Sequence, residues 1–307
     1  MKKQKIKIGT RGSKLALWQT SYLAEKLREQ NPDLVIEIVT IVTTGDKILD
    51  VPLAKIGGKG LFTNEIERAI LAGEVDMAVH SLKDLPTELP SGLIIGALSK
   101  RGEVRDALVS RSGKTLAALP SGAKIGTSSL RRRAQLLAFR PDLCISDLRG
   151  NIDTRLRKLA NGDYDALILA AAGLIRLDRH SEITELLPPD IMLPAVGQGV
   201  LAVEARADDT EILHLLQGIN DRTAAITAAA ERAFLQRLEG GCQVPVGVFA
   251  ELVAGELNVT GIIASLDGAK VIRRSRRGDP ECAIKVGTVL AEELLSSGGS
   301  DILAEIR

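Results

Sequence analysis

The N-terminal part of the chain changes from a strand pattern to a helical pattern of apolar residues. Ile6 and Ile8 alternate with lysines and predict a strand that ends at residues 9–10. An amphipathic helix follows and ends at residues 31–32, an Asn-Pro pair. Its apolar stripe consists of Leu15, Trp18, Tyr22, Leu23 and Leu27. The β-branched run at residues 34–42 then predicts a buried strand.

The next segment combines a glycine-rich loop with another helix and strand. Residues 43–60 are loop-like and end in IGGKG. Residues 61–86 predict a helix, a glycine stop and a strand that runs into Ser81. The apolar residues of this helix are Phe62, Ile66, Ala69 and Ile70. Strands that alternate with helices predict a parallel or mixed sheet with crossover connections.

The same order of elements returns later in the chain. Residues 123–142 repeat the strand, the Gly-Thr pair and the helix of residues 5–19. Residues 149–169 repeat the basic-Gly pair, the helix and the apolar strand of residues 59–79. The repeat is degenerate, so a chance likeness between two ordinary α/β units is the alternative. A duplication predicts two α/β domains of like build that face each other.

After Asp221 the pattern changes to that of a small α+β domain. An alanine-rich helix at residues 223–239 ends at a Gly-Gly pair, and three β-like runs and a closing helix follow. The predicted domains are a first α/β domain of residues 1–99 with 200–217, a second of residues 100–199 and a C-terminal domain of residues 218–307, with hinges near 99–104 and 194–199.

Composition and charge narrow the function classes. The 307 residues carry 40 Lys and Arg against 39 Asp and Glu, so the net charge of +1 gives no global field for nucleic acid or anionic membrane. Aromatic residues make up 2%, which argues against base-stacking surfaces. Neither the three His nor the three Cys have metal-ligand spacing, and no signal peptide or membrane span is recognisable. We expect a soluble intracellular protein without a metal.

A run of arginines at a predicted helix start indicates an anion site. Ser128 and Ser129 are good N-cap residues, which places Arg131 to Arg133 in the first turn of a helix. Cations there oppose the helix dipole unless an anion shares the site. A solvated basic face is the alternative. Arg11 and Ser13 occupy the equivalent place in the first repeat, and further arginines at element ends are Arg149, Arg155 and Arg176. If these ends converge on an interdomain crevice, their cations bind a small polyanion.

Two further segments hold candidate chemistry. Lys83 and Asp84 follow a strand, and Asp84 is a candidate acid–base group with a structural ion pair as the alternative. His80 lies within the apolar strand and is interpreted as a core histidine. Cys242 lies in a glycine-bearing loop, accessible to a ligand but without an activating partner. Cys144 and Cys282 are interpreted as small buried residues.

These motifs together resemble the porphobilinogen deaminase (hydroxymethylbilane synthase) family over essentially the whole chain. The motifs are IGTRGSKLALWQ (8–19), TTGDK (43–47), GGKGLFTNEIE (57–67), AVHSLKDLPT (78–87), GTSSLRRRAQL (126–136), DLRGNIDTRL (147–156), LPAVGQG (193–199) and GGCQVPVG (240–247). The resemblance implies two periplasmic-binding-protein-like (type II) α/β domains and a small α+β domain with a three-stranded antiparallel sheet.

The resemblance also implies an activity and a cofactor. The family is a transferase (EC 2.5.1.61) of tetrapyrrole biosynthesis that joins four porphobilinogen molecules into hydroxymethylbilane and releases ammonia each time. It works on one dipyrromethane cofactor per chain, bound through a thioether. Each pyrrole carries two carboxylates, which would account for arginines in a chain of almost zero net charge. A cytoplasmic monomer with no nucleic-acid or membrane partner is expected.

Site residues follow position by position from the same motifs. Cys242 would carry the cofactor, and Asp84 would assist loss of the aminomethyl group and stabilise the resulting cation. Cofactor carboxylates would be held by Lys83, Ser129, Arg131, Arg132 and Arg155. The incoming ring or the chain would be bound by Arg11, Ser13, Phe62, Arg149, Arg176 and Gln198. Lys55 and Lys59 would lie on a mobile loop, and Arg133 has no family role. A non-catalytic anion-binding protein of the periplasmic type is the alternative.

Overall fold

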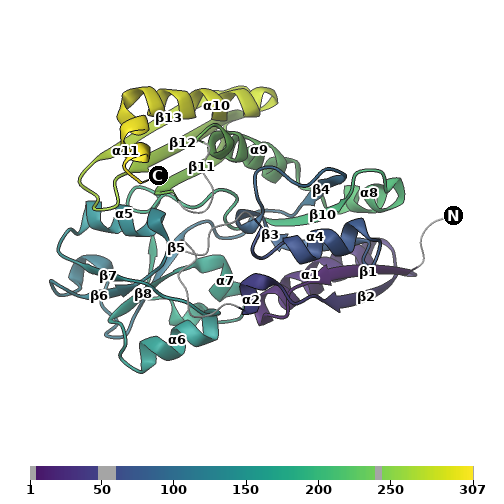
Figure 1. Ribbon diagram of the computed structural model, residues 1–307, viewed down its shortest axis with the longest axis horizontal. Helices are drawn as coiled ribbons and strands as arrows, with labels where there is room; N and C mark the ends of the chain where they lie inside the picture. The colour runs from purple at the N-terminus through teal and green to yellow at the C-terminus, as the bar shows by residue number, and fades with distance from the viewer. Residues whose placement is uncertain (1–4, 48–59, 239–243, 307) are drawn as a thin grey trace. The chain divides into compact units, whose positions relative to one another are not determined.

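The structure is a computed structural model that describes residues 5–47, 60–238 and 244–306 (Figure 1). The chain divides into two compact units. Unit 1 comprises residues 1–49, 58–102 and 199–225, and unit 2 comprises residues 50–57, 103–198 and 226–307. The predicted division into three domains stays a prediction. None of the helices in the described ranges is long and apolar enough to cross a membrane.

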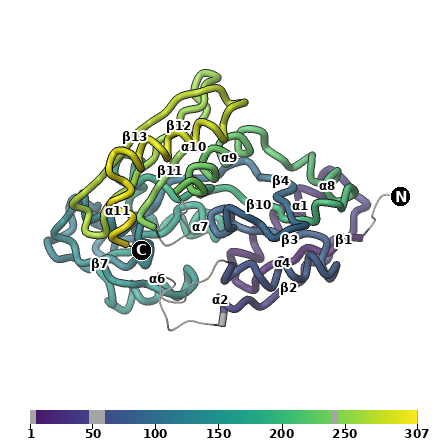
Figure 2. Tube along the Cα trace, turned by 45° about the horizontal axis from the view of Figure 1, so that its top comes forward, coloured from purple at the N-terminus to yellow at the C-terminus, as the bar shows by residue number. Residues whose placement is uncertain are grey.

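Unit 1 is built on a five-stranded mixed sheet in the order β2-β1-β3-β10-β4. The strands are β1 (Lys5–Thr10), β2 (Val35–Thr40), β3 (Met77–Ser81), β4 (Leu93–Leu98) and β10 (Leu201–Arg206). The helices are α1 (Lys14–Gln30), α2 (Thr44–Lys47), α4 (Asn64–Leu71) and α8 (Thr210–Leu216), with a 3₁₀ turn, η1, at Leu82–Asp84. β1 pairs in parallel with β2 and β3, whereas β10 runs antiparallel to β3 and β4. Figure 2 follows this path along the chain.

Unit 2 repeats this sheet and adds a second one. Its five-stranded sheet has the order β7-β6-β8-β5-β9, with β6 parallel to β7 and β8 and with β5 antiparallel to β8 and β9. The strands are β5 (Asp106–Ser110), β6 (Lys124–Gly126), β7 (Cys144–Ser146), β8 (Ala166–Ala170) and β9 (Glu185–Leu187). The helices are α5 (Leu130–Phe139), α6 (Ile152–Ala160) and α7 (Ala171–Arg176). Strand order and direction agree between the two sheets, as the sequence repeat predicts.

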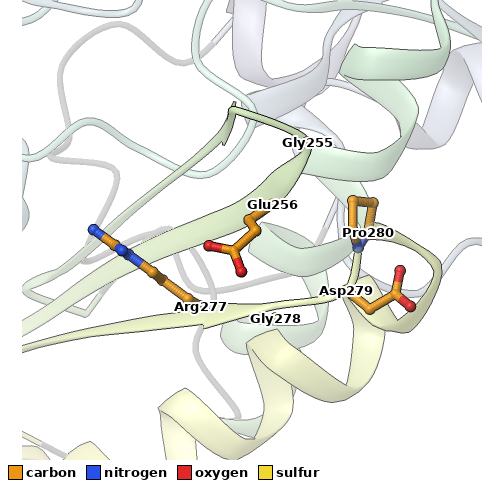
Figure 3. Close-up of a pocket in the computed structure, with 6 residues that line it drawn as sticks. All are labelled: Gly255, Glu256, Arg277, Gly278, Asp279 and Pro280. Atoms are coloured by element: carbon orange, nitrogen blue, oxygen red, sulfur yellow. The ribbon is translucent and has the colours of Figure 1, made fainter.

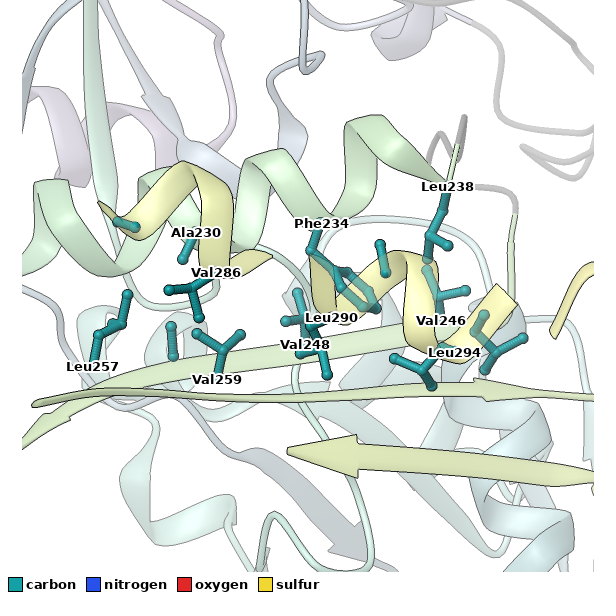
Figure 4. Close-up of a cluster of buried hydrophobic side chains, with 14 of the residues drawn as sticks. Ala230, Phe234, Leu238, Val246, Val248, Leu257, Val259, Val286, Leu290 and Leu294 are labelled. Carbon is teal, nitrogen blue, oxygen red and sulfur yellow. The ribbon is translucent and has the colours of Figure 1, made fainter. Parts of the chain in front are cut away.

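The C-terminal part of unit 2 is a three-stranded antiparallel sheet covered by helices. The strands are β11 (Val246–Val253), β12 (Glu256–Ala264) and β13 (Val271–Gly278), and the helices are α10 (Ala283–Leu294) and α11 (Ser300–Ala304). α9 (Arg222–Arg237) packs Ala230 and Phe234 into the core of this sheet, beside Leu290 of α10 (Figure 4). Gly261 makes room for the aromatic ring, since a Cβ there would lie 2.6 Å from Phe234 Cε2. The two mixed sheets and this antiparallel sheet confirm the predicted α/β architecture.

Four local expectations need correction. β2 is an edge strand rather than a buried one, and Val35 is 57% exposed, because an edge strand can have the same β-branched composition as a central one. Trp18, placed on the apolar stripe of the first helix, is 38% exposed and stacks on Tyr22. Residues 44–47, expected as loop, form the short helix α2. Cys144 and Cys282 are both exposed, so their interpretation as buried residues is wrong.

Candidate active site

A pocket in unit 1 lies where strand ends meet a helix start. Neighbouring parallel strands end at the same edge of a sheet, and β1 and β3 are such neighbours. The chain after β1 supplies Arg11 and Ser13, and η1 directly after β3 supplies Asp84. The pocket is lined by Arg11, Ser13, Leu15, Ala16, Gln19, Phe62, Thr63, Val79, His80, Ser81 and Asp84. Four of the sequence-predicted site residues therefore share one pocket.

The Arg11 side chain is fixed by an acid and by an aromatic ring. Its Nε lies 3.2 Å from Asp46 Oδ1, and its guanidinium carbon lies 4.1 Å from the centre of the Phe62 ring. Burial alone would raise the pKa of Asp46, but hydrogen bonds from Arg11 and Thr43 lower it below its ordinary value. Gly45 is needed beside the ring, because a Cβ there would lie 2.2 Å from Phe62 Cε1. The TTGDK motif thus holds a cation and an aromatic face at the pocket wall.

Asp84 is exposed at the end of a well-anchored turn. The Leu82 N–H donates to the Val200 carbonyl at 3.0 Å, and the Leu85 N–H donates to the Leu82 carbonyl at 3.1 Å. Gln19 Nε2 donates to Ser81 Oγ at 2.9 Å and ties the same turn to α1. The Asp84 carboxylate is accordingly free of burial costs while its backbone is held in place. Lys83 is half-buried beside it.

In unit 2 the predicted helix start is confirmed at α5. Ser129 is its N-cap, and its Oγ accepts from the Arg132 N–H at 3.4 Å. Ser128 Oγ accepts from the Leu148 N–H at 2.9 Å and donates to the Leu148 carbonyl at 3.1 Å. The serines therefore fix both the helix N-terminus and the neighbouring loop after β7.

Arg131 and Arg132 are buried and share a carboxylate that sequence reasoning missed. Asp106, which is fully buried, lies 2.8 Å from Arg131 Nη1 and 2.7 Å from Arg132 Nη2. Burial alone would raise the pKa of Asp106, but the two guanidinium charges lower it far below its ordinary value. Burial also lowers the pKa of Arg131, against the opposing effect of Asp106. The only signal in the sequence was a lone acid at the start of an apolar strand.

Gln198 completes this buried cluster. Its Nε2 donates to the Val104 carbonyl at 2.7 Å and to Asp106 Oδ1 at 3.1 Å, while its Oε1 has no hydrogen-bond partner. Two guanidinium groups face one carboxylate, so the cluster carries one positive charge in excess. A carboxylated ligand fits this cluster, because it would supply the missing negative charge. Arg133 is exposed, in accord with a solvated face.

The other predicted arginines of unit 2 lie at element ends. Arg155 of α6 donates through Nε to the Gly150 carbonyl at 2.8 Å, which braces the loop that carries Arg149. Asn151 caps the same helix. Arg176 is the last residue of α7 and is half-buried. That these residues and those of unit 1 line one crevice stays a prediction.

Three predicted residues are not part of the described structure. Cys242, Lys55 and Lys59 lie outside the described residues. A second pocket, where β12 begins and β13 ends, holds none of the predicted residues (Figure 3). It is lined by Gly255, Glu256, Arg277, Gly278, Asp279 and Pro280. Within the described residues, no group of three His, Cys, Asp or Glu side chains could hold a metal ion.

The fold and the described side chains define a class: an α/β protein with cationic side chains at strand ends and at a helix N-terminus. Two family models match the chain: "Porphobilinogen deaminase, dipyromethane cofactor binding domain" over residues 6–214, and "Porphobilinogen deaminase, C-terminal domain" over residues 225–296. The chain belongs to the porphobilinogen deaminase family. It is a transferase (EC 2.5.1.61) that polymerises porphobilinogen to hydroxymethylbilane with a dipyrromethane cofactor. The non-catalytic alternative is therefore wrong.

Curated relatives agree with the family models over the full length. The porphobilinogen deaminase of Desulforamulus reducens is 53% identical over 99% of both chains. That of a Roseiflexus species is 55% identical over 98% of this chain and 99% of the relative. Among solved structures, the Bordetella pertussis BvgS VFT2 domain is 15% identical, with a TM-score of 0.42 over 70% of this chain and 86% of that chain.

Proposed function

We propose that Asp84 is the catalytic carboxylate with which this enzyme deaminates and joins four porphobilinogen molecules, in the pocket of unit 1. The observation that carries this assignment is the pocket itself. It holds an exposed carboxylate on an anchored turn together with a cation fixed on an aromatic face. A pyrrole with two carboxylates and an aminomethyl group needs both kinds of partner.

The pocket residues of unit 1 have two roles, substrate binding and stabilisation of developing charge. Arg11 and Ser13 bind carboxylates of the incoming ring, and Phe62, which holds the Arg11 guanidinium on one face, packs near that ring. Positive charge develops on the ring as ammonia leaves, and the Asp84 carboxylate stabilises that charge electrostatically. Asp46 balances part of the Arg11 charge and keeps its side chain in one orientation, so less entropy is lost on binding.

The residues of unit 2 and Lys83 hold the carboxylates of the cofactor and of the growing chain. When bound, the cofactor supplies the pyrrole end to which the first substrate is joined. Cofactor carboxylates are assigned to Lys83, Ser129, Arg131, Arg132 and Arg155. Arg149, Arg176 and Gln198 are assigned to the substrate chain. Because Gln198 Nε2 is already engaged, its free Oε1 suits a pyrrole N–H better than a carboxylate.

Cys242→Ser should prevent stable cofactor attachment. A serine ether would have to form in place of the thioether, and a neutral hydroxyl is a much weaker nucleophile than a thiol. Intact-mass spectrometry of the purified variant is expected to show the sequence mass alone, with no tetrapyrrole formed from porphobilinogen. Cys144→Ser and Cys282→Ser are matched controls and should keep the wild-type added mass. A covalently loaded Cys242→Ser protein would overturn the assignment.

We also propose that the enzyme is a cytoplasmic monomer with three domains, divided as the sequence predicts. The monomeric state is supported by the proposed assignments, because all binding residues for substrate and cofactor belong to one chain. Light scattering of the eluting protein should give the mass of one chain, and a dimer mass would contradict this.

A further inference from the structure

Three ionisable side chains lie buried together behind the unit 1 pocket. Glu67 of α4 is 4% exposed, His80 of β3 is 6% exposed and Glu204 of β10 is 0% exposed. His80 Nε2 lies 3.0 Å from Glu204 Oε2. β3 and β10 are antiparallel neighbours in which His80 pairs with Ala202 and Ala78 pairs with Glu204, so the two side chains are diagonal neighbours. The histidine is buried as predicted, but it also lines the pocket.

The fold itself does not require these charges. The repeat aligns residues 59–79 with 149–169, so the next position, His80, corresponds to Ala170 of β8. The same alignment matches Ala78 of β3 with Ile168 of β8. Glu204 pairs with Ala78 and Leu108 pairs with Ile168, so Leu108 is the counterpart of Glu204 in unit 2. The same sheet in unit 2 therefore has alanine and leucine at these two places. Burial of unpartnered carboxylates costs stability, so we infer that the charged cluster of unit 1 has a functional role beyond packing.

The cluster holds more acid than its one imidazole balances. Glu67 Oε1, both Glu204 oxygens and His80 Nε2 lack a hydrogen-bond partner, although Nε2 lies within ion-pair distance of Glu204 Oε2. Burial raises the pKa of Glu67 above its ordinary value, and the nearby Glu204 charge adds to the rise, against opposing effects of Thr63 and His80. Glu204 Oε2 is the carboxylate oxygen that faces the imidazole. The charged groups around His80 are Glu67 from α4, Glu204 from β10, Asp84 from η1 and the Arg11–Asp46 pair at the pocket wall.

We propose that His80, oriented by Glu204, is a second proton-transfer group of this pocket beside Asp84. Each addition forms one C–C bond between two pyrroles and breaks the C–N bond of the aminomethyl group and one ring C–H bond. The proton from the C–H bond ends on the departing ammonia. A side chain that accepts this proton from the ring carbon and releases it to the ammonia would complete the reaction. His80 Nε2 faces Glu204 Oε2 at 3.0 Å, so Nδ1 is the nitrogen that we assign to proton exchange. This inference deepens the proposed function and rests on it.

The test compares His80→Asn with His214→Asn, a matched control at an exposed position of α8. Loss of a proton-transfer group should lower kcat by about 10²–10⁴-fold with KM little changed. The pH profile of kcat should lose the ionisation that His80 contributes, and the control should keep the wild-type rate and profile. Intact mass should show that His80→Asn still carries the cofactor. A kcat within about twofold of wild type, or an unchanged pH profile, would overturn the proposal.

Two further variants separate proton transfer from packing. Imidazole in solution should restore part of the rate of His80→Ala and leave Asp84→Asn unaffected. Glu204→Gln keeps the side-chain volume and should lower kcat by less than the His80 variants do. If the His80 variants do not fold, this variant alone tests the proposal. No rescue by imidazole, or full activity of Glu204→Gln, contradicts the proposal. If the wild-type enzyme forms no tetrapyrrole from porphobilinogen, the proposed function fails instead.

Discussion

Asp84→Asn lowers kcat by about 10²–10⁴-fold and leaves the covalent cofactor in place. Asparagine keeps the shape of the side chain but removes the negative charge that faces the pocket. The substrate still binds through Arg11 and Ser13, so KM should change far less than kcat. Steady-state kinetics measure the two constants, and intact-mass spectrometry of the same preparation reports cofactor loading.

Asp33→Asn is the control for this experiment, since Asp33 is an exposed acid of unit 1 outside the pocket. It should retain wild-type kcat and KM. A loaded Asp84→Asn enzyme with kcat within about tenfold of wild type would show that this carboxylate is not the main stabiliser of the developing charge. An Asp84→Asn protein without cofactor would place the residue in cofactor assembly instead.

Asp106→Asn is expected to lower the free energy of unfolding by about 3–5 kcal/mol, because it leaves two buried guanidinium groups without their anion. Glu292→Gln is the control: it breaks the exposed Arg237–Glu292 pair and should cost about 1 kcal/mol or less. Denaturant titrations of both variants measure the difference. Equal losses would mean that the buried cluster is no more stabilising than a surface pair.

The same carboxylate gives stability a predicted pH dependence. The pKa of Asp106 is lower in the folded chain than its ordinary value of 3.8, so its contribution is present above pH 3.8 and is lost as pH falls towards the folded pKa. Asp142 has the same sign, since hydrogen bonds from Arg140 lower its pKa to about 2, but it lies at the surface. The acid unfolding profile of Asp106→Asn should therefore be flatter below pH 3.8 than that of Asp142→Asn.

The repeat in the sequence predicted the two sheets because each repeated segment contains a complete strand–helix unit. The start of α5 could be predicted as well, since Ser129 caps the helix through a local hydrogen bond. The edge position of β2 could not, because strand order is set by contacts with β1 that local composition does not encode. The arginine run predicted an anion site, and the structure adds that two of its members are buried around Asp106.

Asp106 and Glu204 could not be predicted as members of buried clusters, and the physical reason is the same for both. Asp106 lies 25 residues before Arg131, and Glu204 lies 124 residues after His80, so neither pairing leaves a local pattern. Glu204 reaches His80 because β10 pairs with β3 in the first sheet, although every strand of the five-stranded second sheet lies between them in the sequence. A lone acid in an apolar strand is the one local sign that such a partner exists, since a buried charge requires compensation.

The central claim is that this chain builds hydroxymethylbilane on a primer attached through Cys242, and intact mass during turnover tests it most directly. The purified protein should weigh more than its sequence by two porphobilinogen units, each less one ammonia. Brief incubation with porphobilinogen should then add further units one at a time. A protein that shows only its sequence mass, before and after incubation, would contradict the account.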